Sequence, residues 1–356
     1  MAPYCEAVSH NSFHVLDART SPALFAPGLW IYGVMTMTHV LTGSRGAATG
    51  PLVGMICMAM AMLLLPVGDT FAKLLTSHLG AVEVTTARLL AQGLVMMPIA
   101  VVLRHRLRGP MFSPIVVLSG GLVMITLTSL VWAFSVMPIA TAIAIFFAEP
   151  LILTLLVGPL LGERVGPRRL VAVGVGLIGV LLVVRPGGDL GLAALLPLVA
   201  ATAYALNMIV LRRASGIRSG LTVQCGATAY ACVGMTSLCI ILAAAGWIQP
   251  DFATLPDWGW GAIAASGLFA AVSFILIAEA FRRAEAGMLA PFQYLEIIGA
   301  TIVGYIVFGD FPDELTWVGV AIILASGLYV FWREQVPSNR GSILPGRRRT
   351  RRIRVR

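Results

Sequence analysis

Two carboxylates, Glu149 and Glu296, lie in the middle of segments that are long and apolar enough to cross a lipid bilayer. A carboxylate at the centre of a membrane helix costs about 2.5–3.5 kcal/mol on insertion, so it usually faces a bundle interior or a watery cavity. Pro150 removes one backbone donor and disturbs the turn before it, which leaves carbonyl groups beside Glu149 for a ligand or water. Glu149 is therefore predicted to be a proton-responsive or cation-binding group.

The surroundings of Glu149 recur at a constant spacing of 147 residues without a gap. Polar residues at matching depth carry this register, because Leu, Val and Ala match by chance in an apolar sequence. The matched sets are Glu149 with Glu296, Thr154 with Thr301, Glu163 with Asp310, and Ser119-Gly120 with Ser266-Gly267. The chain is thus interpreted as two copies of one unit. The second copy differs in one respect, since Pro291 precedes Glu296 by five residues instead of following it.

Other polar side chains within the expected spans could complete a site around these acids. They are Asp69, Lys73 and Arg88 in the first two spans, Tyr204 and Asn207 in the sixth, and Gln293 and Tyr294 beside Glu296. Asp69 and Lys73 are four residues apart, a spacing that also favours a local ion pair. Arg88 could face Asp69 or Glu149, or hold a substrate carboxylate. Structural pairing of the two glutamates with Arg88 or Lys73 is the alternative to a role in binding.

Composition determines the class of protein, because 58% of the residues are hydrophobic and only 12% are charged. Windows of about 20 apolar residues, the length that a helix needs to cross the bilayer, follow one another with short connections. The predicted spans are 52–74, 81–103, 114–136, 139–161, 168–185, 191–211, 222–245, 258–281, 287–308 and 315–333. The prediction is an all-α integral membrane protein with ten transmembrane helices. An odd number of helices per repeat makes these two inverted five-helix repeats.

Arginines gather in alternate loops, which predicts the orientation because Lys and Arg concentrate in short cytoplasmic loops. These loops lie at 104–108, 164–169, 212–218 and 282–283. Both termini are therefore expected on the cytoplasmic side of the inner membrane. The expected organisation is a peripheral or disordered leader at 1–50, five-helix repeats at 51–188 and 189–334, and a basic cytoplasmic tail at 335–356. An eleventh span in the leader, or a start codon upstream of the real one, are alternatives.

The basic tail follows the last span directly, a position that favours contact with anionic lipid headgroups over nucleic acid. A GxGxxG pattern at 174–179 lies inside an apolar span, where glycines serve helix packing and not a dinucleotide. The sequence has no HExxH motif and no P-loop. No enzyme activity, cofactor or metal site is predicted.

The repeated spans, Arg88, and the run AxxxFFxEPLILTLLxxxLLGE around Glu149 resemble the EamA family of the drug/metabolite transporter superfamily. The resemblance covers residues 51–333. It implies a secondary transporter of small metabolites, with a central cavity between the halves. Members of the family carry amino acids, sugars, nucleotide-like cofactors and toxic amines, so membership names no substrate.

The predicted function is alternating access around a mid-membrane site, with a small-molecule substrate and protons as partners. Glu296, Gln293 and Tyr294 would line the wall opposite Glu149, and Tyr204 and Asn207 would supply hydrogen bonds. Two acids with Arg88 to one side favour a zwitterion such as an amino acid or an S-adenosylmethionine-like metabolite. If the acids are protonated or paired, an uncharged aromatic solute such as a flavin fits equally well. A membrane scaffold, a receptor and a channel are the competing classes.

Overall fold

The computed structural model describes residues 50–162, 166–185, 191–214 and 217–335. Within them, ten helical segments of 18–27 residues are apolar enough to cross a membrane, and no strand occurs. The predicted fold class is therefore confirmed. The predictions made for the leader and the tail lie outside the described residues, and the predicted orientation of the termini stays a prediction.

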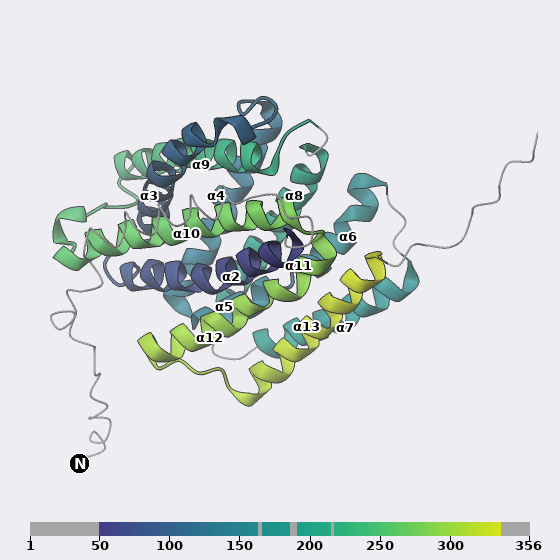
Figure 1. Ribbon diagram of the computed structural model, residues 1–356. Coiled ribbons are helices and arrows are strands. Elements are labelled where there is room, and N and C mark those ends of the chain that lie inside the picture. The colour runs from purple at the N-terminus through teal and green to yellow at the C-terminus, as the bar shows by residue number, and fades with distance from the viewer. Residues whose placement is uncertain (1–49, 163–165, 186–190, 215–216, 336–356) are drawn as a thin grey trace, which may run out of the picture.

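The described part of the first repeat contains six α-helices, of which two short ones share a span (Figure 1). They are α2 (Gly50–Leu75), α3 (Ala81–Val102), α4 (Pro114–Val136), α5 (Ile139–Phe146), α6 (Glu149–Leu161) and α7 (Pro167–Val184). The second repeat has the same order. Its helices are α8 (Leu195–Ala214), α9 (Gly220–Ala244), α10 (Asp257–Arg283), α11 (Ala286–Gln293), α12 (Leu295–Phe308) and α13 (Glu314–Gln335).

The fourth and ninth spans are each broken into two helices, whereas the sequence predicts one segment for each. The first break falls between α5 and α6, just before Pro150, whose ring and missing donor disfavour a continuous helix there. The second break falls at Tyr294, between α11 and α12, three residues after Pro291. Both broken spans end on a glycine in the left-handed conformation, Gly162 at φ 70° and Gly309 at φ 71°. The 147-residue register therefore matches helix ends as well as sequence.

The two repeats interleave, because the most extensive contacts join a helix of one repeat to a helix of the other. Helix α2 packs on α10, α4 on α8, and α7 on α13. Figure 1 shows α7 and α13 running side by side as a pair. The repeat mates Gly120 and Gly267 permit two equivalent close approaches. A Cβ at Gly120 would lie 2.7 Å from the Cβ of Tyr230 on α9, and a Cβ at Gly267 would lie 2.4 Å from the Cβ of Ala91 on α3.

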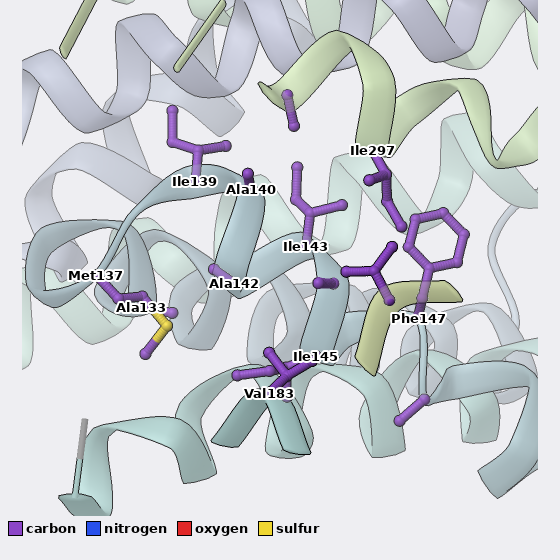
Figure 2. Close-up of a cluster of buried hydrophobic side chains, with 14 of the residues drawn as sticks. Ala133, Met137, Ile139, Ala140, Ala142, Ile143, Ile145, Phe147, Val183 and Ile297 are labelled. Atoms are coloured by element: carbon purple, nitrogen blue, oxygen red, sulfur yellow. The ribbon is translucent and has the colours of Figure 1, made fainter. Parts of the chain in front are cut away.

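The largest buried hydrophobic cluster surrounds α5 and draws on both repeats. Ile143 and Ile145 are fully buried within it, and Ile297 of α12 packs into the same cluster. Figure 2 shows the Ile297 side chain directed toward the ring of Phe147. The short helix α5 is thus held by aliphatic packing, which fixes the position of the break that follows it.

Candidate functional site

The two predicted acids each lie in the first turn of the second half of a broken span. Glu149 is the first residue of α6, and Glu296 is the second residue of α12. The first turn of a helix carries unpaired N–H groups and the positive end of the helix dipole, so it favours a negative charge. Half-helix ends of this kind line ion and substrate sites in secondary transporters. The breaks therefore place two carboxylates at equivalent positions of the two repeats.

Two tyrosines, one on α8 and one at the second break, lie near these carboxylates. The Tyr204 hydroxyl on α8 experiences the charges of both Glu149 and Glu296, and the Tyr294 hydroxyl experiences that of Glu149. The ring of Phe146 lies 5.6 Å from that of Tyr204, measured between centroids, and the ring of Phe147 lies 5.4 Å from that of Tyr294. Each of the two tyrosines near the acids is thus paired with a phenylalanine from the first break.

Neither acid forms an ion pair within the described residues. The Oε1 atom of Glu149 is buried and has no hydrogen-bond partner there. Pairing of the glutamates with Arg88 or Lys73, the structural alternative, is contradicted because both cations bind other acids. A buried polar atom without a partner costs about 1–3 kcal/mol, so Glu149 is a candidate to bind a cation or a proton.

Arg88 on α3 forms a buried ion pair with Asp69 on α2, with a distance of 2.7 Å between Nη1 and Oδ1. The sequence suggested Asp69 or Glu149 as the partner of Arg88, and in the structure the partner is Asp69. Gln92, one turn further along α3, donates to Thr228 of α9 at 3.4 Å. The charges of Asp69 and Arg88 both act on Glu296, so this pair borders the acid site.

Lys73 pairs with Asp310 and not with Asp69, so the local ion pair suggested by their spacing is wrong. Its Nζ lies 2.9 Å from Oδ2 of Asp310, donates to the carbonyl of Met137 at 3.3 Å, and lies 4.4 Å from the Phe308 ring centroid. The packing of α2 beside α12 decides this choice, because it brings the end of α2 to the loop after α12. Lys73 therefore joins the two repeats.

A second ion pair joins the same loop to the first repeat. Arg185, which follows α7, donates to Asp313, the residue that caps α13. Hydrogen bonds from Thr316 and from Arg185 lower the pKa of the Asp313 carboxyl to about 2. Asp313 therefore remains charged at any physiological pH. We call these two pairs, Lys73–Asp310 and Arg185–Asp313, the outer clasp, because both lie on the side predicted to be external.

The opposite end of the bundle has its own charged junction, at Glu279 near the end of α10. Glu279 is 4% exposed and accepts hydrogen bonds from Arg282 at 2.5 and 2.8 Å and from Arg283 at 2.6 Å. Arg106, in the loop after α3, donates to it at 3.3 Å. These contacts satisfy the hydrogen-bonding capacity of the Glu279 carboxylate, which indicates a structural role.

The remaining predicted residues divide between packing and the acid site. Asn207 is buried and accepts a hydrogen bond of 2.6 Å from Ser119, which ties α8 to α4. Gln293 is half-buried and ends α11 next to Tyr294. Phe146, Phe147 and Asp310 were not predicted to take part in the site. Two signals were available, because the phenylalanines directly precede the Glu149 segment and Asp310 is the repeat mate of Glu163.

Ten spans in two inverted repeats, with interrupted helices that meet at a pair of carboxylates, define the architecture of a secondary transporter. The EamA-like transporter family model matches this chain twice, at residues 52–185 and 191–332. The chain belongs to the EamA-like transporter family, as the resemblance predicted.

The chain is similar to curated transporters of two named kinds. It is 32% identical to a riboflavin transporter of Rhizobium johnstonii over 55% of this chain and 63% of that protein. It is 30% identical to a riboflavin transporter of Vibrio cholerae over 59% of this chain and 68% of that protein. It is 26% identical to an S-adenosylmethionine uptake transporter of Rickettsia prowazekii over 80% of this chain and 94% of that protein.

A solved structure titled "Crystal structure of protein" has the same fold. It superposes with a TM-score of 0.54 over 82% of this chain and 100% of its own, at 19% sequence identity. At that identity the likeness concerns the fold alone.

Proposed function

We propose that this protein moves an S-adenosylmethionine-like zwitterion across the inner membrane by alternating access, with Glu149 as the proton-responsive or cation-binding group. The observation that carries the proposal is the buried, unpartnered Oε1 of Glu149 at the start of a half-helix. A carboxylate with no basic partner attracts either a proton or the cationic part of a substrate. Exchange between these two occupants couples substrate movement to protons.

The sulfonium of such a substrate would bind between Glu149 and Glu296. Arg88 is engaged with Asp69, so it contributes to the charge near Glu296 and is a weaker candidate for holding a substrate carboxylate. The cationic end is therefore the better defined part of the proposal. The similarity to S-adenosylmethionine uptake transporters extends over most of both chains and supports the same substrate class.

Riboflavin is the second candidate. The aromatic rings near the acids favour a flat solute, and two of the relatives named above, at 32% and 30% identity, are riboflavin transporters. Protonated glutamates would then act as hydrogen-bonding groups toward the imide and hydroxyls of the flavin.

Flux into proteoliposomes tests the proposal. The purified protein should take up labelled S-adenosylmethionine saturably, and an imposed pH gradient should change the initial rate. Riboflavin, methionine and a sugar phosphate serve as parallel solutes. Uptake of riboflavin alone would favour the second candidate, whereas saturable uptake of the sugar phosphate alone would contradict the argument from charge.

The outer clasp provides a prediction about alternating access. Lys73→Met removes an ion pair between the repeats, and a partly buried pair is worth about 1 kcal/mol, or about a fivefold change in population. We expect the external opening to become correspondingly more populated. The measurement is the rate at which a membrane-impermeant maleimide labels Gln293→Cys in a cysteine-free background.

The charge-swapped variant Lys73→Asp/Asp310→Lys is the matched control, because it restores the pair with its signs reversed. Its labelling rate should return toward that of the parent protein. Equal labelling rates in the parent, Lys73→Met and the swapped variant would contradict a role for the clasp.

A further inference from the structure

We infer that the two ring pairs near the acids bind a flat heteroaromatic ring of the substrate, with Tyr294 as the residue that determines specificity. The inference rests on the proposed function because it concerns the same site. It adds a requirement, since the carboxylates by themselves would accept any small organic cation.

The position of the rings follows from the helix breaks. Phe146 ends α5 and Phe147 follows it, two residues before Glu149. Tyr294 occupies the equivalent break of the second repeat, one residue after α11. Because the chain changes direction at these points, rings and carboxylates from both repeats are brought to the same level of the bundle.

Packing alone accounts for Phe147, which is buried, but not for the other three rings. The aliphatic residues of the surrounding cluster, such as Ile143 and Ile145, are fully buried, whereas Phe146, Tyr204 and Tyr294 are only half-buried. The two ring pairs are tilted by 57° and 39°, so neither is a closed parallel stack. Part of each of these three side chains is therefore left uncovered by protein.

Such a combination suits one ligand chemistry in particular. An aromatic face attracts a flat ring by stacking and a cation through its quadrupole, and a neighbouring carboxylate accepts from N–H and O–H groups. A nitrogen heterocycle joined to a cationic or hydroxyl-rich chain satisfies all of these contacts at once. A small sulfonium or ammonium without a ring has the acids and the cation–π attraction but lacks the stacking contact.

Gly327 on α13 sets the position of the Tyr294 ring. A Cβ at Gly327 would lie 2.6 Å from the Tyr294 hydroxyl, so an alanine there must displace the end of that side chain. The displaced group is the far end of a side chain and not backbone, so the fold can accommodate it. Gly327 is therefore a positioning residue, and Gly327→Ala moves the ring while its chemistry stays unchanged.

The test compares ligands with and without the ring, by equilibrium binding to the full-length protein in lipid nanodiscs. S-adenosylmethionine and S-methylmethionine carry the same sulfonium zwitterion, and only the first has a heterocycle; adenosine and riboflavin carry the heterocycle without the sulfonium. We expect S-adenosylmethionine to bind at least tenfold more tightly than S-methylmethionine. Tyr294→Leu should abolish this advantage and weaken S-methylmethionine binding much less than S-adenosylmethionine binding, while Tyr294→Phe should retain the advantage.

Two glycine variants complete the comparison. Gly327→Ala should reduce the advantage of ring-bearing ligands, and Gly174→Ala, where a Cβ meets nothing within 4 Å, should not. The inference is overturned if S-methylmethionine binds as tightly as S-adenosylmethionine, if Tyr294→Leu weakens every ligand equally, or if no ligand binds to the folded protein. Ring-dependent binding without flux would reject the proposed transport and keep the inference. Flux without a preference for ring-bearing ligands would support the proposed transport and overturn the inference.

Discussion

Glu149→Gln is expected to leave the protein folded at a near-normal level and to reduce substrate flux at least tenfold, or to make the remaining flux independent of pH. The amide keeps the shape and hydrogen-bonding capacity of the side chain but cannot exchange a proton. Because Glu149 has no ion-pair partner within the described residues, the substitution leaves no buried cation unpaired. The measurement is initial uptake across a range of external pH values, with protein level determined in the same membranes.

Glu314→Gln is the matched control, since Glu314 is an exposed acid in the first turn of another helix. Its flux and pH profile should equal those of the parent. A Glu149→Gln protein whose flux still follows pH as the parent's does would eliminate Glu149 as the titrating group. A large fall in protein level would instead indicate that the carboxylate has a structural part.

The second large effect is expected at the buried pair of Asp69 and Arg88. Removal of one partner leaves an uncompensated charge inside the bundle, which costs about 3–5 kcal/mol. Arg88→Met should therefore lower the thermal midpoint strongly. The double variant Asp69→Leu/Arg88→Met, which removes both charges, should recover most of that loss. Thermal unfolding of the detergent-solubilised protein, followed by size-exclusion chromatography, measures both variants.

The exposed pair Arg185–Asp313 supplies the contrast, because its side chains are 41% and 53% exposed. Exposed ion pairs contribute little to stability, so Arg185→Met should leave the midpoint nearly unchanged. If the double variant at Asp69 and Arg88 were as unstable as the two single losses added together, the two side chains would not be energetically coupled.

The broken spans mark the boundary between what could and could not be predicted about the site. Pro150 predicts a disturbed turn beside Glu149, and the structure has the break there. The second break was harder to predict from the sequence. Pro291 lies before Glu296, whereas Pro150 follows Glu149, so the two copies differ in the position of the proline. The structure nevertheless has both acids in the first turn of a half-helix, so the positions of the two acids are preserved although the prolines are not.

The sequence by itself determined the class, the ten spans and the repeat, since these depend on local quantities: the length of apolar runs and a constant spacing between polar residues. Only the tertiary structure decided which charges meet. Asp69 has Lys73 four residues away on its own helix, yet it pairs with Arg88, and Lys73 pairs with Asp310, which lies 237 residues further along the chain. The spacing of charged residues along one helix shows only which partners each side chain could reach. The choice among them depends on how α2 is rotated against α3 and α12, and that rotation is fixed by the packing of all the helices together.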